Sequence, residues 1–281
     1  MRWVNTPRIA LLGLGLLVLA SVTVRAYLAN KIVAPQLLCD EFIYAGIAKS
    51  LALDGHFRLR DEPSVLSFVY PALLAPAWWA HSMERVYFLA KGINAFVMTL
   101  AAFPFFFWVR RLSSSAWALV ATGLLLVLPA FNYTGMLMSE NAFLPMFLVA
   151  TFAIASSLEN PTTLRQVLTV AAIAVSLGVR AQAVALVLVL PGAILLYALL
   201  DRSEPIGPWD RMIRGLRANR VSLLTLGGLA AFFVALRFAG SQSDTLGVYQ
   251  VVFETHYSLL EGLRWSGYHL ADLTLVTGAC P

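Results

Sequence analysis

Long apolar runs separated by short polar segments dominate the chain. Five of them carry at most one charged residue each and cover residues 9–28, 88–109, 116–131, 142–158 and 221–238. Helices of this length can cross a hydrocarbon layer of about 30 Å. A sixth run, 166–200, is too long for one helix, and we divide it into two spans that meet at Arg180-Ala181-Gln182. The pattern predicts an all-α, polytopic transmembrane helix bundle of about seven spans.

The segment 29–87 does not fit the pattern of spans. Its second half, Tyr70 to Trp79, is apolar but interrupted by Pro71 and Pro76. Proline breaks helices, and tryptophan favours the headgroup level of a membrane. We therefore expect a pair of interfacial or re-entrant helices here, with Trp78 and Trp79 as anchors. If this segment were a true span, every later loop would lie on the opposite side of the membrane.

Composition supports a membrane protein and excludes several other classes. Apolar residues make up 59% of the chain and charged residues 12%, with a mean hydropathy of +0.76. A soluble domain would be about 25% charged. The net charge of +5 does not indicate nucleic-acid binding, because the basic residues gather in loops between apolar runs. Two cysteines, Cys39 and Cys280, form neither a disulfide framework nor a metal-ligand motif.

The distribution of charge predicts the topology. Four short segments, 1–8, 110–115, 159–165 and 201–220, together hold ten Lys and Arg but only four Asp and Glu. The rest of the chain holds ten Lys and Arg and eleven Asp and Glu. Because short basic loops stay in the cytoplasm, we expect a multi-pass plasma-membrane protein with a cytoplasmic N-terminus. Most acidic residues then lie on the extracytoplasmic side.

Beyond the last span, residues 239–281 form a polar, aromatic tail, which we expect to be extracytoplasmic. Residues 273–281 are typical of the first turns of another spanning helix, so we expect a truncated span and a missing C-terminal partner segment. The domain prediction is therefore a transmembrane domain over 1–238, with its outer loop at 29–87, followed by this tail.

The main candidate for chemistry is the acidic pair Asp40-Glu41, which starts a helical pattern that Gly55 ends. One interpretation is local: Asp40 caps the helix and Glu41 favours its first turn. The other is functional: paired carboxylates at a low-dielectric boundary can hold a general base or bind a divalent cation.

Two further candidates lie in other loops. Glu140 starts the fourth span, where Ser139 could cap the helix, and its simpler interpretation is a solvated helix start. Arg180 stands inside a long apolar run, beside Gln182, and either binds a phosphate or snorkels to water at the turn.

The remaining candidates are weaker. Tyr44 lies on the same helix face as Glu41. Its hydroxyl could donate a hydrogen bond to a carboxylate or a substrate, or the ring could simply pack in the protein interior. Arg58 and Lys91 are outer cations that could meet an anionic headgroup or act as interfacial anchors. The four histidines show no metal-binding spacing.

These motifs resemble integral-membrane glycosyltransferases of the C-type superfamily, in particular the protein O-mannosyltransferase and lipid A aminoarabinose transferase branch. The resemblance covers about residues 1–200. It rests on the stretches Asp40-Glu41-Phe42-Ile43-Tyr44-Ala45, Tyr70-Pro71 through Trp78, Met138-Ser139-Glu140-Asn141 and Val179-Arg180-Ala181-Gln182. Where the aminoarabinose branch has a lysine that binds the donor phosphate, this chain has Val69-Tyr70-Pro71, so Arg180 or Lys91 would take that role.

The resemblance implies transfer of a sugar from a polyprenyl-phosphate donor to a lipid, glycan or protein acceptor, on the extracytoplasmic face and with inversion. Asp40 would be the general base and Glu41 would orient it. Glu140 would complete the acidic pocket or, with Asp40, hold a divalent metal ion. Arg180 would neutralise the departing phosphate. Two alternatives stay open: a transporter or lipid-carrier flippase, and a truncated scaffold without activity.

Overall fold

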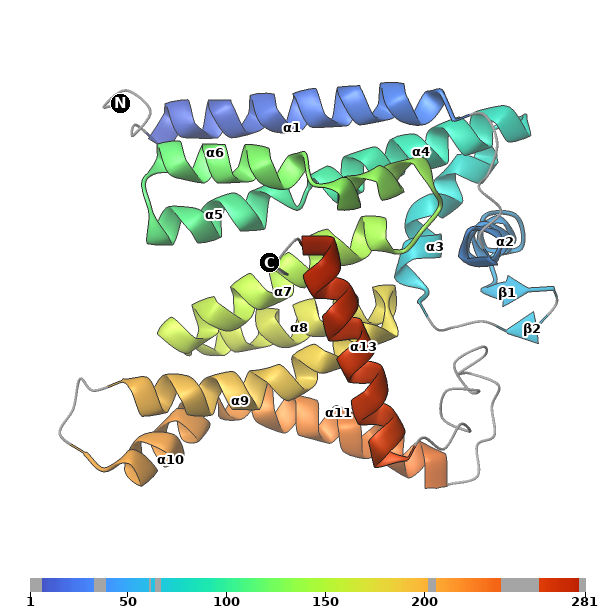
Figure 1. Ribbon diagram of the computed structural model, residues 1–281. Coiled ribbons are helices and arrows are strands. Elements are labelled where there is room, and N and C mark those ends of the chain that lie inside the picture. The colour runs from blue at the N-terminus through green and yellow to red at the C-terminus, as the bar shows by residue number, and fades with distance from the viewer. Residues whose placement is uncertain are drawn as a thin grey trace. The chain divides into compact units, whose positions relative to one another are not determined.

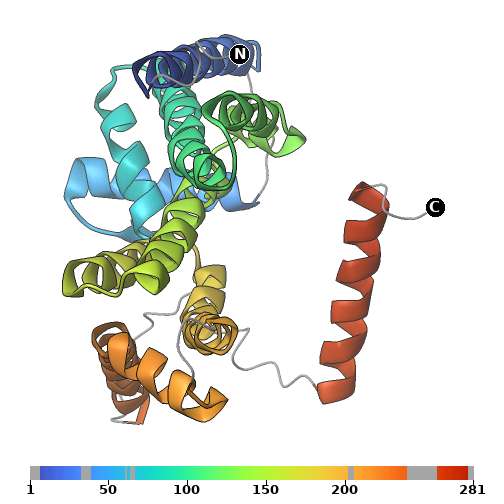
Figure 2. The same cartoon turned by 90° about the vertical axis from the view of Figure 1, so that its left-hand side faces the viewer.

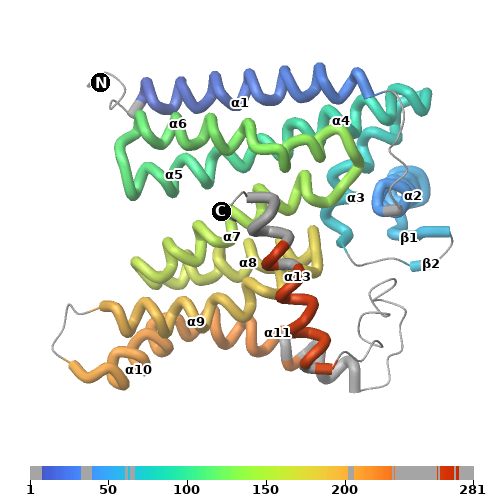
Figure 3. The backbone as a smooth tube through the Cα atoms, viewed as in Figure 1, coloured from blue at the N-terminus to red at the C-terminus, as the bar shows by residue number. Residues whose placement is uncertain are grey.

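The computed structural model describes the backbone of residues 7–32, 39–60, 62–63, 67–201, 206–238 and 258–277 (Figure 1). Figure 3 follows the same backbone as a smooth tube. The chain divides into two compact units, Met1–Thr245 and Leu246–Pro281. Each unit is described by itself below.

The described part of the chain is predominantly helical (Figure 1). The first half contains α1 (Pro7–Asn30), α2 (Cys39–Asp54), β1 (Arg58–Leu59), β2 (Glu62–Pro63), α3 (Val69–Leu74), η2 (Ala75–Trp79), α4 (Met83–Thr99), α5 (Ala102–Leu112), α6 (Ser115–Leu126) and η3 (Pro129–Gly135). The second half contains α7 (Glu140–Glu159), α8 (Thr163–Val179), η4 (Ala181–Ala183), α9 (Val184–Leu200), α10 (Pro208–Ala218), α11 (Arg220–Phe238) and α13 (Leu259–Thr277).

Membrane-spanning character is confirmed at a coarser level than the predicted seven spans. Among the described residues, four helices are long and apolar enough to cross a membrane: Arg8–Asn30, Met83–Leu112, Glu140–Glu159 and Ala181–Leu200. The other three predicted spans correspond to a pair of helices, α6 and η3, bent by 55°, and to two shorter apolar helices, Thr163–Val179 and Arg220–Leu229.

Prolines explain where the helices of two predicted spans break. In the third span α6 ends at Leu126, because Pro129 forces Leu128 into an extended conformation and starts η3. Within the second span, α4 and α5 are separated at Leu100-Ala101, and Pro104 cannot accommodate the carbonyl of Leu100 in a regular helix.

The segment between α2 and α4 also differs from the prediction. Its helical pair breaks at Pro76, whereas Pro71 lies inside α3. Of the two expected anchors, Trp79 is 69% exposed but Trp78 is only 8% exposed and packs in the core. The two-stranded hairpin of β1 and β2 was not predicted.

The segment 201–220, which the sequence analysis treated as a loop, contains the amphipathic helix α10. Pro208 stands at its first turn, a position where the missing N–H costs nothing. Gly215 lets α10 approach α9 closely, since a Cβ at this position would lie 2.8 Å from the Cβ of Ala198.

Three hydrophobic clusters hold the Met1–Thr245 unit together. One, around Tyr70 and Leu74, joins α2, α3, η2 and α4, and a second, around Phe106, joins α1, α4, α5 and α6. The third, around Ile173 and Leu190, joins α7, α8, α9 and α11. Figure 2 views this unit from the end that carries α10.

The long helices of this unit begin and end on two opposite sides (Figure 1). We call the end with Asp40, Glu41 and Glu140 the acidic end. The other we call the arginine end, and it holds Arg110, Arg111, Arg165, Arg211, Arg214, Arg217 and Arg220.

In the Leu246–Pro281 unit, the described part is α13. Ser258 and Glu261 form a capping box at its start: the Ser258 Oγ accepts from the Glu261 N–H at 3.2 Å, and Glu261 Oε2 accepts from the Ser258 N–H at 2.9 Å. The Ser258 N–H and the Ser258 hydroxyl both donate to Glu261 Oε2, and these two hydrogen bonds lower the pKa of Glu261. Residues 273–277 are the last turns of this helix, so the expectation that a helix begins at 273 was wrong.

Candidate functional site

The acidic pair lies in the first turn of α2, and its two carboxylates have different surroundings. Glu41 is 3% exposed, and its Oε1 accepts hydrogen bonds from the Leu137 backbone N–H at 2.8 Å and the Tyr87 hydroxyl at 3.2 Å. Leu137 lies 96 positions later in the chain, in the segment between η3 and α7. Glu41 therefore fastens α2 to the start of α7.

Asp40, in contrast, is partly exposed and makes no hydrogen bond or ion pair with the residues that the structure describes. The prediction that it caps α2 is wrong, because the helix already begins at Cys39. The first-turn position places its carboxylate at the positive end of the helix dipole. Asp40 is thus the carboxylate of the pair that solvent or a ligand can reach.

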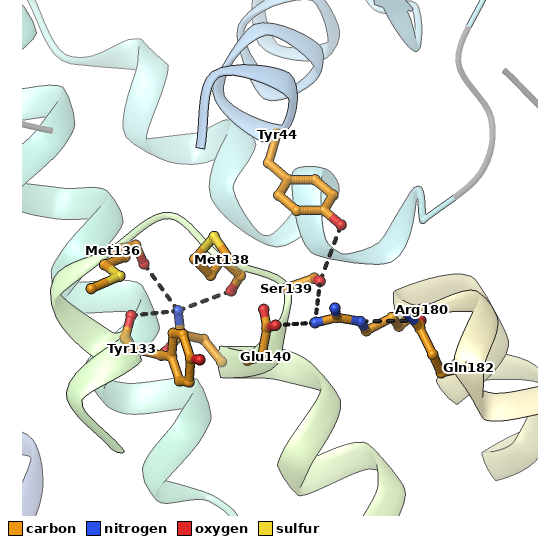
Figure 4. A network of polar contacts seen from close by, with 9 residues as sticks. Tyr44, Tyr133, Met136, Met138, Ser139, Glu140, Arg180 and Gln182 are labelled. Carbon is orange, nitrogen blue, oxygen red and sulfur yellow. Dashed lines mark hydrogen bonds and ion pairs between the residues drawn. The ribbon is translucent and has the colours of Figure 1, made fainter. Parts of the chain in front are cut away.

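Tyr44, one turn further along α2, extends the link to α7 (Figure 4). Its hydroxyl donates to the Oγ of Ser139 at 3.1 Å, and its ring packs edge-on against Tyr70 with 5.1 Å between ring centroids. The predicted capping role of Ser139 is wrong, since this hydroxyl makes no cap hydrogen bond with α7. It accepts from Tyr44 instead.

Glu140 and Arg180 form an ion pair next to Ser139 (Figure 4). The Arg180 Nη1 also lies 3.5 Å from the Ser139 Oγ, and the Arg180 Nε donates to Gln182 Oε1 at 3.1 Å. The side chains of Arg180 and Glu140 are 22% and 25% exposed, so solvent reaches the pair. The Oε2 of Glu140 is buried, and no described residue hydrogen-bonds to it.

Arg180 reaches this position because the chain leaves α8 there. Arg180 itself is extended, with φ −156° and ψ 133°, and the short η4 follows before α9. Gly178 permits the close approach of α8 to α3, because a Cβ there would lie 2.8 Å from Val69 Cγ2. The predicted division of the run 166–200 at Arg180 is therefore confirmed.

Two buried asparagines, which the sequence analysis did not single out, hold the segment between η3 and α7. The side-chain amide of Asn141 donates to the carbonyls of Tyr133, Met136 and Met138 at 2.9 to 3.0 Å. Asn94, in α4, donates to the Met136 carbonyl at 2.7 Å and accepts from the Tyr70 hydroxyl at 3.0 Å. For Asn94, an asparagine inside a largely apolar run was the available signal.

Tyr70 connects Asn94 to Tyr44, since its hydroxyl donates to Asn94 and its ring packs against the ring of Tyr44. Burial raises the pKa of its phenol, so the hydroxyl stays protonated and remains a hydrogen-bond donor. Asn94, Asn141 and Tyr70 therefore hold this part of the site with uncharged groups, although the buried Oδ1 of Asn141 has no hydrogen-bond partner among the described residues.

Lys91 and Arg25 are charged residues within helices that could span a membrane, and backbone carbonyls engage both. The Nζ of Lys91 lies 4.4 Å from the centre of the Tyr87 ring and donates to the carbonyls of Ala29 and Ile32 at the end of α1. Arg25, which the sequence analysis left aside, donates to the carbonyls of Leu126 and Phe131 at the bend between α6 and η3. Both side chains therefore fix helix ends near the site.

The remaining predicted residues lie at the edge of the acidic end. Arg58 is exposed in β1, while its neighbour Arg60 lies over the ring of Phe42 in α2, 5.4 Å from its centre. No group of three or more His, Cys, Asp or Glu that could hold a metal occurs among the described residues, so a metal role for Asp40 and Glu140 stays a prediction.

The structure thus brings Glu41, Tyr44, Glu140, Arg180 and Gln182 into one connected region at the acidic end. Neither of the two pockets described for this structure is lined by these side chains: one lies at the arginine end, and the other lies along η3. Comparisons of the chain with protein-family models, with curated proteins and with solved structures find no match.

Proposed function

We propose that the chain is a membrane glycosyltransferase that transfers a sugar from a polyprenyl-phosphate donor to an acceptor hydroxyl on the extracytoplasmic face. One observation carries the proposal. Acidic, aromatic and cationic side chains from α2, α7 and the break after α8 meet at the acidic end, opposite the arginine end. The positive-inside rule assigns that end to the outer face.

In this mechanism the two carboxylates of α2 have separate tasks. Asp40, which solvent can reach, accepts the proton of the acceptor hydroxyl as its oxygen attacks the anomeric carbon. The bond from that carbon to the phosphate oxygen breaks, the phosphate leaves with the electron pair, and the configuration inverts. Glu41 is occupied by Leu137 and Tyr87 and acts by positioning the helix that carries Asp40.

The cation that the leaving phosphate requires is Arg180. Stabilising charge that develops on a leaving group is commonly a large part of catalysis. In the absence of substrate, Glu140 holds the guanidinium at the site, and a phosphate would compete with Glu140 for it. Lys91, whose ammonium is held by two carbonyls, is the weaker candidate for the phosphate ligand.

The decisive experiment is a transfer assay with purified protein and a panel of polyprenyl-phosphate sugars. Asp40→Asn should lower the rate by about 10²-fold or more, as expected for loss of a general base. The matched control is Asp54→Asn, an exposed acid at the other end of α2, and it should leave the rate unchanged. Wild-type protein that transfers no sugar from any donor would leave the scaffold alternative, and an active Asp40→Asn would remove Asp40 as the base.

Topology can be tested separately in whole cells. In a background with Cys39→Ser and Cys280→Ser, a membrane-impermeant maleimide added outside should label Lys49→Cys in α2 and should not label Arg217→Cys in α10. The reverse pattern would place the acidic end in the cytoplasm and overturn the proposal. The transporter alternative relied on charges within the spans, but the carbonyl partners of Arg25 and Lys91 favour a structural role.

A further inference from the structure

A second polar site lies at the arginine end, remote from Asp40 and Arg180. It is a pocket of about 240 Å³ between the end of α7, the end of α9 and α10. Arg211 and Arg214 of α10 line it, together with Asp201, Glu159 and Asn219.

Two buried polar atoms of this lining have no partner among the described residues. The first is the Nε of Arg211, whose Nη1 is occupied by the carbonyls of Leu199 at 3.2 Å and Asp201 at 2.9 Å. The second is the Oδ1 of Asn219, a residue that is only 4% exposed. The amide nitrogen of Asn219 is held by the Gly215 carbonyl at 3.0 Å. One donor and one acceptor without a partner among the described residues therefore lie in the wall of the pocket, and burying such atoms without a partner is costly.

The charges of the lining restrict what can satisfy these atoms. Two guanidinium groups favour a phosphate. A simple anion would also face the carboxylates of Asp201 and Glu159, although Arg111 already engages Glu159 at 3.1 Å. A phosphodiester that carries hydroxyl groups matches both the basic and the acidic side chains of the lining. Its phosphate would contact the arginines, and its hydroxyls would donate to the carboxylates and to Asn219.

The surroundings of the pocket indicate a lipid as the source of this group. α9 belongs to a candidate span, and Leu200 at its end and Trp209 at the start of α10 are each 69% exposed. An amphipathic helix with an exposed tryptophan and arginines is typical of a membrane interface. Anionic lipids also gather at arginine-rich protein surfaces.

We propose that this pocket binds the headgroup of an acidic phospholipid with a polyol headgroup, such as phosphatidylglycerol, in the leaflet at the arginine end. The phosphate contacts Arg211 and Arg214, the headgroup hydroxyls contact Asn219 and Asp201, and the acyl chains lie along α9. This site is independent of the glycosyltransferase proposal, because no residue is shared with the acidic end.

The test is a lipid titration of the full chain in detergent, read by native mass spectrometry and by thermal stability. Phosphatidylglycerol should bind and raise the melting temperature more than phosphatidylcholine does. Arg214→Gln should weaken binding of phosphatidylglycerol about tenfold, the usual size of one charge-assisted phosphate contact. The matched control is Arg217→Gln, an exposed arginine of the same helix that does not line the pocket.

Three outcomes would overturn the proposal. They are equal binding of the two lipids by the wild type, equal weakening by Arg214→Gln and Arg217→Gln, and competition by soluble glycerol phosphate at the same concentration as the lipid. The last would identify a soluble ligand instead. The melting temperature of each variant without lipid shows whether it is folded, and the wild-type comparison of the two lipids does not depend on any variant.

Discussion

The two ends of the Met1–Thr245 unit use polar residues in different ways. At the acidic end, buried side chains bind backbone atoms of distant segments: Glu41 binds the N–H of Leu137, and Asn94 binds the carbonyl of Met136. At the arginine end, the ion pair between Arg111 and Glu159 has side chains 35% and 53% exposed. Buried hydrogen bonds to charged groups contribute far more than exposed ion pairs do. The buried Gln166 also binds distant backbone at the arginine end, namely the Ala218 carbonyl and the Ser222 N–H. The difference between the ends therefore lies in their charged groups, the buried Glu41 against the more exposed pair of Arg111 and Glu159.

The largest effect that would test this comparison is expected from Glu41→Ala. It leaves the Leu137 N–H and the Tyr87 hydroxyl without their buried acceptor, and we expect about 3 kcal/mol of destabilisation. Unfolding in detergent should be compared with that of Asp54→Ala, which removes an exposed acid from the same helix. Equal stability of the two variants would show that the acidic end is not held by Glu41.

A smaller effect is expected from Tyr44→Phe, which keeps the ring against Tyr70 and removes only the hydroxyl. The loss should be about 1 kcal/mol, the usual net value of one hydrogen bond. A double-mutant cycle with Ser139→Ala measures the coupling between the two side chains. A coupling energy near zero would contradict a direct link from α2 to α7.

The smallest effect is expected at the arginine end, from Arg111→Gln. The ion pair with Glu159 is half exposed, so its loss should cost less than about 1 kcal/mol, and the difference should shrink at high salt. Thermal unfolding at low and high ionic strength checks both points. A loss as large as that of Glu41→Ala would mean that the two ends do not differ.

Several features followed from the sequence because they depend on local physics. Apolar runs predicted membrane helices, and Gly55, at φ +72°, ends α2 as expected. The break at Arg180 was found because a charged residue in a long apolar run is costly. Pro104 and Pro129 could have predicted the helix breaks within the second and third spans, and the amphipathic pattern of 208–218 could have revealed α10.

Other features depended on contacts between segments far apart in the chain. The sequence presented Asp40 and Glu41 as an equivalent pair, and only packing made Glu41 a buried anchor and left Asp40 accessible. Ser139 was predicted as a cap, but the arrival of Tyr44 from α2 gives its hydroxyl another partner.

The sequence by itself thus determined which segments are helices suited to a membrane, and which end of the bundle is acidic or basic. These properties follow from hydrophobicity and charge, which each residue carries wherever it lies. Only the tertiary structure decided which carboxylate is buried, that Arg180 pairs with Glu140, and that Lys91 and Arg25 hold helix ends. The physical reason is that a hydrogen bond or ion pair requires two groups within about 3 Å, and that distance is set by how the helices pack.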